Sequence, residues 1–342
     1  MQRIIMPFFV AVFITLIMTP LVRKFAFKIG ALDIPKDERR VHKEPMPLLG
    51  GVAIYIGVVI ACLMFLPMDR TLISILIGGT LILISGIIDD LKGLSPKHKI
   101  IFQLLAGLVL IAGDVKVDFI TNPFTVDNAV VYLKWLSIPI TLFWVVGITN
   151  TLNLIDGLDG LAAGVAMISS LSLTLVAQKF GYNTVVIMSA IIAGGCLGFL
   201  RFNFNPAKIF MGDTGALFLG FMLAAISIEG VMKSVATIAI IVPIIILGVP
   251  IFDTTFAIFR RILSGKSIMS ADKGHLHHRL LARGYSQRKT VLILYAISGF
   301  FGAFAVLVAK ANSQQAVYLS VIMFVVTVIF AMKFGLFRSK KD

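Results

Sequence analysis

Four polar side chains recur at three-residue intervals in the segment NTLNLIDGLDGLAAG, residues 150–164, which lies between two apolar runs. They are Asn150, Asn153, Asp156 and Asp159. A carboxylate at a bilayer centre costs about 2.5–3.5 kcal/mol, so these groups either lie outside the hydrocarbon or serve a function. In an α-helix, each three-residue step falls about 60° short of a full turn. Side chains at this spacing therefore drift around the helix, and the four groups cannot form one narrow stripe on its surface. Gly157 and Gly160 predict a helix break, and we expect the polar groups to line the bend. The simpler alternative, in which Asp159 caps the next helix, leaves the other three unexplained.

Two more acidic segments border apolar runs. Asp89 and Asp90 end one run, where carboxylates are unfavourable because a helix C-terminus is already negative. A divalent cation or a substrate would offset this repulsion, and a solvated turn with Lys92 as partner is the simpler alternative. Asp213, in the segment MGDTG, begins another run. It is a candidate N-cap, but helix N-termini also attract phosphate, and we expect Asp213 to hold a metal ion there.

Three other groups of residues contribute candidates for a phosphate and nucleotide site. The segment GHLHHRLLARG, residues 274–284, holds three of the five histidines, which could donate to phosphate or relay protons. A solvated loop is the alternative, and zinc is disfavoured because no cysteine accompanies the histidines. Phe210 could stack on a base, although aromatic residues are common at membrane interfaces. Lys43 could reach a nucleotide or serve only as an orientation signal.

The rest of the chain is too apolar for a soluble protein. Of its 342 residues, 58% are hydrophobic and 14% charged, and the mean hydropathy is +0.98, whereas soluble domains hold about 25% charged residues. Eleven apolar blocks are long enough to cross about 30 Å of hydrocarbon, which predicts an all-α polytopic membrane protein with one domain over residues 1–342. Pro243 and Pro250 predict a bent or split ninth helix. The predicted spans are 4–22, 48–66, 71–88, 100–113, 135–149, 161–178, 184–200, 214–229, 235–256, 291–309 and 316–334.

The basic residues predict the orientation. With the amino terminus outside and the carboxyl terminus in the cytoplasm, 24 of the 31 Lys and Arg fall on the cytoplasmic side, as the positive-inside rule requires. Twelve of the 17 acidic residues fall there too. The net charge of +14 therefore reflects orientation and affinity for anionic lipid or substrate, and it gives little support to nucleic-acid binding. The predicted site loops on this side are 23–47, 89–99, 150–160, 201–213 and 257–290.

Taken together, the segments resemble a known family. DDLKGLSPK, NTLNLIDGLDGLAAG, NFNPAKIFMGDTGA and HLHH occur in this order within residues 45–283, and they are similar to the motifs of the polyprenyl-phosphate N-acetylhexosamine-1-phosphate transferases. The chain looks most like the bacterial branch that moves N-acetylglucosamine-1-phosphate from UDP-N-acetylglucosamine to undecaprenyl phosphate. Members of that branch start the synthesis of wall teichoic acid or surface polysaccharides, at the cytoplasmic face of the plasma membrane.

The resemblance implies roles for individual residues. It implies Mg²⁺, with Mn²⁺ as an alternative, held by Asp213, and a lipid groove beside the split ninth helix. It also implies the lipid bilayer as environment, UMP and a lipid pyrophosphoryl sugar as products, and a homodimer. The catalytic candidates are Asp89, Asp90, Asn153, Asp156, His277 and His278; the substrate-binding candidates are Lys43, Asn150, Asp159, Asn203, Phe210, His275 and Arg279.

Two alternatives stay open. A phospho-N-acetylmuramoyl-pentapeptide transferase is the sibling reaction, but such relatives carry three consecutive histidines where this chain has HLHH, and a different loop where it has PMPLLGG. A transporter also uses intramembrane acids and broken helices, although here the acids gather at one face and no repeat is visible. Within the transferase mechanism, direct attack of the lipid phosphate in one step is favoured, and a covalent aspartyl intermediate at Asp89 is the alternative.

Overall fold

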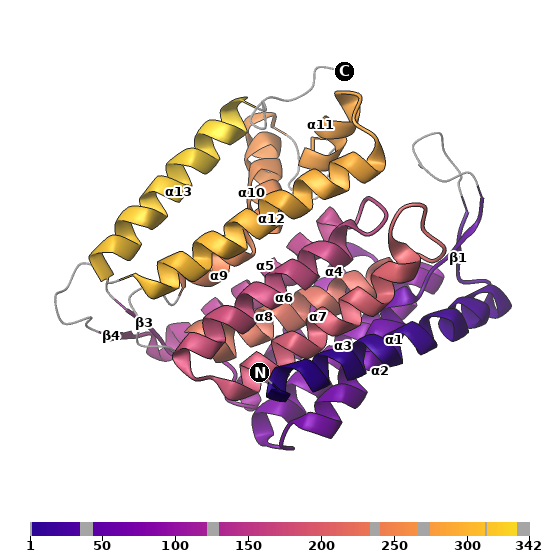
Figure 1. Ribbon diagram of the computed structural model, residues 1–342, viewed down its shortest axis with the longest axis horizontal. Helices are drawn as coiled ribbons and strands as arrows, with labels where there is room; N and C mark the ends of the chain where they lie inside the picture. The colour runs from indigo at the N-terminus through magenta and orange to yellow at the C-terminus, as the bar shows by residue number, and fades with distance from the viewer. Residues whose placement is uncertain are drawn as a thin grey trace.

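The computed structural model describes residues 2–34, 44–121, 130–232, 240–265, 274–311 and 313–333. These residues form mainly α-helices, as the apolar blocks predict, with two short antiparallel hairpins, β1–β2 and β3–β4, at opposite ends of the helix bundle (Figure 1). The helices are α1 (Gln2–Ile29), α2 (Gly50–Phe65), α3 (Arg70–Lys92), α4 (Pro96–Ala112), α5 (Ser137–Ile155), α6 (Leu161–Phe180), α7 (Asn183–Asn203), α8 (Gly212–Ser227), α9 (Ile241–Ile246), α10 (Gly248–Leu263), α11 (Leu276–Ala282), α12 (Gln287–Lys310) and α13 (Ser313–Lys333). A 3₁₀ turn (Lys134–Leu136) precedes α5, a π-helical turn (Ile228–Met232) follows α8, and the strands are β1 (Leu32–Asp33), β2 (Met46–Pro47), β3 (Phe119–Thr121) and β4 (Val130–Tyr132).

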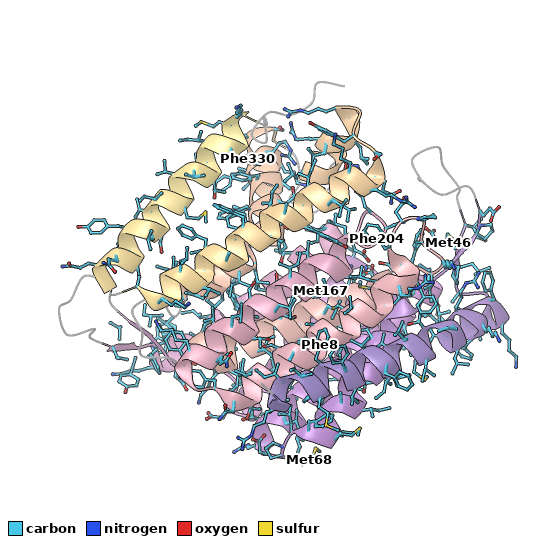
Figure 2. The ribbon with its side chains drawn as sticks, in the orientation of Figure 1. Phe8, Met46, Met68, Met167, Phe204 and Phe330 are labelled. Carbon is cyan, nitrogen blue, oxygen red and sulfur yellow. The ribbon has the colours of Figure 1, made fainter. Side chains whose placement is uncertain are left out.

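The helices have the length and composition of a multi-pass membrane protein. Within the described ranges, eight helices are long and apolar enough to cross a membrane, namely α1, α3, α5, α6, α7, α8, α12 and α13. The predicted spans 48–66 and 100–113 correspond to shorter helices, α2 with 16 residues and α4 with 17. Side chains of α1 and α13 project outward from the bundle (Figure 2), and many of them are exposed and apolar. The total of eleven crossings and their orientation stay predictions.

The ninth predicted span, 235–256, is split as the prolines predicted. Helix α9 ends at Ile246 and α10 begins at Gly248, so the two meet at Leu247. Pro243 and Pro250 each lie within the first turn of their helix. A backbone nitrogen in a first turn has no intrahelical acceptor, so a proline costs least there.

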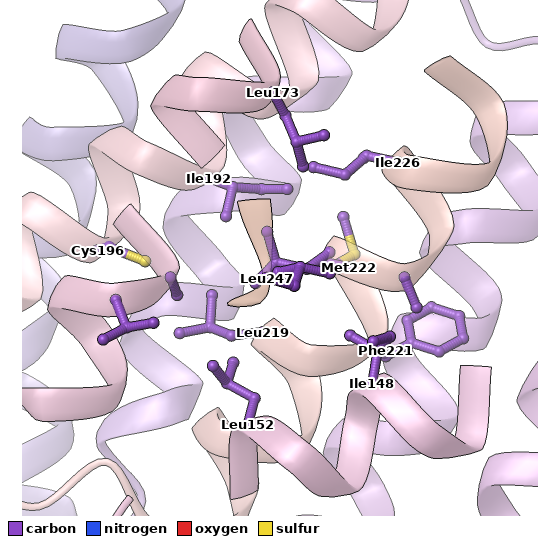
Figure 3. Close-up of a cluster of buried hydrophobic side chains, with 14 of the residues drawn as sticks. Ile148, Leu152, Leu173, Ile192, Cys196, Leu219, Phe221, Met222, Ile226 and Leu247 are labelled. Atoms are coloured by element: carbon purple, nitrogen blue, oxygen red, sulfur yellow. The ribbon is translucent and has the colours of Figure 1, made fainter. Parts of the chain in front are cut away.

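Helix α8 forms the centre of the bundle. Every residue from Thr214 to Ser227 is buried, and a helix that is apolar on all sides is a core helix. Figure 3 shows its side chains among those of α5, α6 and α7; the labelled residues are Ile148 and Leu152 of α5, Leu173 of α6, Ile192 and Cys196 of α7, Leu219, Phe221, Met222 and Ile226 of α8, and Leu247. The buried cysteines, Cys62 and Cys196, are free.

Glycines let the neighbouring helices approach the first turns of α8. A Cβ added to Gly51 of α2 would lie 2.1 Å from the backbone nitrogen of Gly215, and one added to Gly86 of α3 would lie 2.4 Å from the Cα of Thr214. Small residues at helix contacts are typical of membrane proteins, because close backbone packing replaces the hydrophobic effect there. These contacts fix the start of α8 against α2 and α3.

Replacing Gly86 with alanine should therefore destabilise the fold. Overpacking of a core costs about 1–3 kcal/mol, and the opposing atoms here belong to backbone that cannot rotate away. We expect Gly86→Ala to lower the thermal unfolding midpoint of the purified protein in detergent. Gly147→Ala is the matched control, since a Cβ at Gly147 in α5 meets nothing within 4 Å; equal midpoints for the two variants would contradict this packing argument.

Candidate active site

A cavity of about 680 Å³ lies at the end of the bundle where α3, α5 and α7 finish and α8 starts. It collects residues that are far apart in the sequence. The predicted site residues in its wall are Asp90, Asn153, Asp156, Asp159, Asn203, Phe210, Asp213 and His278. The described residues Asp89, Asn150, His275, His277 and Arg279 lie outside this lining, and Lys43 lies outside the described residues.

Asp90 caps the N-terminus of α8 from another helix. Its Oδ1 accepts a hydrogen bond from the backbone N–H of Asp213 at 2.9 Å. Its Oδ2 accepts from the Thr214 N–H at 3.2 Å and from the Thr214 hydroxyl at 2.6 Å. The predicted N-cap role of Asp213 is wrong: the N-cap position is Met211, which makes no side-chain cap. Asp90 supplies the acceptor that a capping side chain normally gives, and it thereby fixes the turn that carries Asp213.

Lys99 joins two of the acidic residues, and sequence reasoning missed it. Its Nζ lies 2.8 Å from Oδ2 of Asp89 and 2.5 Å from Oδ2 of Asp213. The other oxygen of Asp89 accepts the N–H of Leu94 at 2.6 Å. A signal was present in the sequence: the short turn between α3 and α4 brings a lysine in the first turn of α4 back beside the acids that end α3.

The acids fit a divalent cation. Asp89, Asp90 and Asp213 each offer an oxygen, and these three atoms lie within 4.8 Å of one another. Magnesium prefers oxygen ligands and usually takes one or two protein carboxylates together with substrate phosphates. Three carboxylates face one ammonium here, that of Lys99, so the remaining negative charge of the site favours a cation.

The chain breaks between α5 and α6 as predicted. Helix α5 ends at Ile155, and Gly160 has a φ of 78°, which favours glycine. Asn153 and Asp156 face the cavity from the end of α5. The predicted loop 150–160 is thus helical at its start, and the expectation that all four polar groups line the bend is wrong for Asn150. The Asn150 side chain pairs with Gln103 of α4, with an Nδ2 to Oε1 distance of 2.6 Å.

Asp159 and Asn203 tie this bend to the loop before α8. Oδ2 of Asp159 accepts from Nδ2 of Asn205 at 2.9 Å and from the N–H of Ala207 at 3.0 Å. Asn203 accepts from the N–H of Gly160 at 3.0 Å and donates to the carbonyl of Ile209 at 2.9 Å. Asp159 is therefore not the N-cap of α6, a position that Gly160 occupies. The bend and the loop form one hydrogen-bonded wall of the cavity.

Asn205 and Gln287 also belong to this wall and were not predicted. Nδ2 of Asn205 donates to Oε1 of Gln287 at 2.8 Å, and both residues line the cavity. Helix α12 adds two more ties: Arg288 donates to the carbonyl of Asn205, and the Tyr295 hydroxyl donates to the carbonyl of Gly160. The first turns of α12 thereby hold both the bend and the loop.

Phe210 is held on the other wall by main-chain bonds. Its N–H donates to the carbonyl of Pro47 at 2.9 Å, and its carbonyl accepts the N–H of Gly50 at 3.0 Å. It lines the cavity together with Met46 of β2. Figure 2 places Met46 and Phe204 toward the same end of the bundle, away from Met68.

The three histidines have different surroundings. His278 is exposed and lines the cavity, whereas His275 is 5% exposed and its Nδ1 lies 2.8 Å from Oδ2 of Asp253. The His277 ring lies behind the bend, where a Cβ on Gly157 would come within 2.7 Å of its Nε2. Burial, and then the neighbouring His278, lower the pKa of His277 to about 3, so it is neutral at physiological pH. The solvated-loop alternative is therefore wrong for His275 and His277.

Arg279 lies beside the histidines on α11. Its Nε donates to the carbonyl of Gly274 at 2.8 Å. Asp253 accepts the N–H of Leu276 at 2.8 Å and so fixes the start of α11 on α10. The catalytic and binding roles of Arg279, of the histidines and of the other candidates stay predictions.

Asp156, at the bend, has a strongly raised pKa. Its burial, together with the negative charges of Asp213, Asp90 and Asp159, raises the pKa of Asp156 to about 8. A carboxyl group that holds its proton to such a pH can donate a hydrogen bond near neutrality. A bound cation or a donor from a substrate would favour its ionised form.

This shift predicts a pH dependence of stability for the metal-free protein. The unfolded chain loses the Asp156 proton near pH 4, and the folded chain holds it to about pH 8. The unfolded state therefore binds fewer protons between these values, and stability falls as pH rises, by at most about 1.4 kcal/mol per pH unit. Asp156→Asn removes the titrating carboxyl group. The thermal midpoint of this variant in EDTA should therefore fall less between pH 6.5 and 8 than that of the wild type. Parallel curves for the two proteins would contradict the raised pKa.

Comparison with known proteins places the chain among membrane glycosyl transferases. The family model described as glycosyl transferase family 4 matches residues 72–231, which hold the acidic residues from Asp89 to Asp213. The chain is 43% identical to the probable undecaprenyl-phosphate N-acetylglucosaminyl 1-phosphate transferase of Bacillus subtilis, over 99% of this chain and 94% of the relative.

Relatives of lower identity are also named as transferases. The chain is 37% identical to the decaprenyl-phosphate N-acetylglucosaminephosphotransferase of Mycolicibacterium smegmatis, over 86% of this chain and 79% of the relative. It is 31% identical to the phospho-N-acetylmuramoyl-pentapeptide-transferase of Halalkalibacterium halodurans, over 89% and 95%. Full-length similarity of this degree, with the acids gathered in one cavity, shows that the chain belongs to glycosyl transferase family 4.

Proposed function

We propose that this protein transfers N-acetylglucosamine-1-phosphate from UDP-N-acetylglucosamine to undecaprenyl phosphate, with release of UMP. The observation that carries the proposal is the gathering of Asp90, Asp156 and Asp213 in one cavity of a chain that matches, over 99% of its length, a relative named for this reaction. The pentapeptide transferase relative is 31% identical, which favours the simpler sugar over the phospho-N-acetylmuramoyl-pentapeptide.

The cavity suits phosphoryl transfer. This reaction depends on positioning and on neutralising phosphate charge more than on covalent help from the protein. Mg²⁺, or Mn²⁺ in its place, would be held by Asp213 with Asp89 and would supply positive charge to the diphosphate. Asp90 keeps Asp213 in place, His278 lies in the wall as a donor for phosphate, and Phe210 offers a ring to the uracil base.

The reaction proceeds in one step in this proposal. An oxygen of undecaprenyl phosphate attacks the sugar-side phosphorus of the UDP sugar and forms a new P–O bond. The bond from this phosphorus to the oxygen bridging to UMP breaks, and UMP leaves with that oxygen. The surroundings of Asp89 support direct attack over an aspartyl intermediate. One oxygen accepts from Leu94, and the other contacts Lys99 or, in the loaded site, would contact the metal.

A second, apolar cavity suits the lipid tail. It has a volume of about 390 Å³ and lies between α10, α12 and α13. Phenylalanine rings form much of its wall, with Phe252 and Phe301 at a centroid distance of 5.7 Å. Asp253, which contacts His275, is among its lining residues. The prenyl chain would lie in this cavity with its phosphate directed toward the histidines.

The proposed reaction takes place at the cytoplasmic face of the bacterial plasma membrane. The protein is a multi-pass membrane protein by its helices and its family, and the excess of basic residues on one side supports a cytoplasmic active site in the bacterial plasma membrane. The lipid-linked sugar would start teichoic acid or surface polysaccharide synthesis, and a homodimer is part of the same expectation.

Asp213→Asn should strongly slow sugar transfer. Loss of this carboxylate weakens cation binding beside the diphosphate, and we expect kcat to fall by about a hundredfold or more, as when an electrostatic group is removed from other active sites. The assay measures labelled lipid and UMP formed from radiolabelled UDP-N-acetylglucosamine, with EDTA as a second control. Asp118→Asn, at the β3–β4 end of the bundle, should transfer at the wild-type rate. Turnover only with another UDP sugar would correct the substrate, and no turnover with any UDP sugar would favour a transporter.

Filling the apolar cavity should impair use of the lipid alone. Ala296 and Ala303 of α12 are both exposed, but only Ala296 lines this cavity. We expect Ala296→Trp to raise the KM for undecaprenyl phosphate severalfold and to leave the KM for UDP-N-acetylglucosamine unchanged, while Ala303→Trp changes neither. An equal rise in both KM values for Ala296→Trp would place the prenyl chain elsewhere.

A further inference from the structure

Lys99 contacts the two carboxylates that are best placed for a metal ion. Its ammonium lies 2.8 Å from Oδ2 of Asp89 and 2.5 Å from Oδ2 of Asp213, and both residues belong to the acidic group whose oxygens lie within 4.8 Å of one another. The Lys99 side chain is 21% exposed. Lys99 therefore forms partly buried ion pairs with Asp89 and Asp213, and its charge compensates these acids when no metal is present.

The same two carboxylates cannot serve both cations well. A divalent ion between Asp89 and Asp213 would lie at contact distance from the ammonium, and two positive charges so close repel each other strongly. The remaining acid compensates less of a second positive charge, because both oxygens of Asp90 already accept hydrogen bonds from the first turn of α8. One of the two cations must therefore leave.

We propose that Lys99 is an exchangeable counter-ion, so that the metal displaces its ammonium from Asp89 and Asp213 and releases it toward the substrate phosphates. The inference rests on the metal of the proposed function. Lysine suits this exchange, because its ammonium is a compact charge on a flexible four-carbon stem. The exchange keeps the carboxylates compensated at every stage and delivers a positive group to the diphosphate only when the metal is bound.

Metal affinity in the absence of substrate tests the exchange. Mn²⁺ binding to the purified full-length protein is measured from the electron paramagnetic resonance signal of free Mn²⁺. We expect Lys99→Met to lower the Kd for Mn²⁺ by about tenfold or more, a size typical of coupling between two ligands, because the competing ammonium is gone. Lys97→Met is the matched control: Lys97 is exposed, lies in the same helical turn and carries the same charge, so its Kd should stay within about twofold of the wild type. An affinity of Lys99→Met equal to or weaker than that of Lys97→Met would overturn the proposal.

A second measurement uses the wild-type protein and does not depend on a variant that folds. Reductive methylation followed by mass spectrometry reports how accessible each lysine amine is. With Mn²⁺ present, the modification rate of Lys99 should rise severalfold over the rate in EDTA, while that of Lys97 stays unchanged. An unchanged Lys99 rate under saturating Mn²⁺ would contradict the release of the ammonium. Neither measurement involves sugar transfer, so a failure of the exchange and a failure of the proposed reaction can be told apart.

Discussion

The site depends on the contact of Asp90 with the first turn of α8. Helix α8 is the most enclosed helix of the bundle, and its first N–H groups have no acceptor within their own helix. A carboxylate from the end of α3 accepts two of them and the Thr214 hydroxyl. This contact gives the N–H groups of Asp213 and Thr214 an acceptor. It also joins α3 to α8 beside Gly86, and it fixes the turn that carries Asp213.

Around this contact, the protein concentrates negative charge where water and apolar core meet. Asp89, Asp90 and Asp213 lie close together, and Asp156 is near enough to be affected by two of them. Without substrate, these four acids are stabilised by hydrogen bonds, by the Lys99 ammonium and by the proton that Asp156 retains. In the proposed function, phosphate-rich substrates and a cation would complete the compensation and give the electrostatic preorganisation that phosphoryl transfer requires.

Local sequence rules predicted the features with a local cause. The break at Gly157 and Gly160, the split at Pro243 and Pro250, and the gathering of acids at one end of the bundle follow from residue type and spacing. The cap of α8 escaped prediction because its acceptor lies 123 positions away from Asp213, and capping rules consider only neighbours in sequence. The pairing of Asn150 with Gln103 and the burial of His277 depend, likewise, on how helices rotate against each other, which residue spacing does not determine.

Helix α12 borders both cavities. Gln287 at its start lines the polar cavity, Ile293 and Phe300 further along line the apolar one, and Tyr295 between them bonds to the bend that follows Asp156. A movement of α12 on filling of one cavity would therefore also move part of the wall of the other. Thermodynamic reciprocity then applies: whatever factor the lipid imposes on the affinity for the nucleotide sugar, the nucleotide sugar imposes on the affinity for the lipid. Under the proposed function, α12 is therefore the element of the fold through which the two chemically unlike substrates would affect each other.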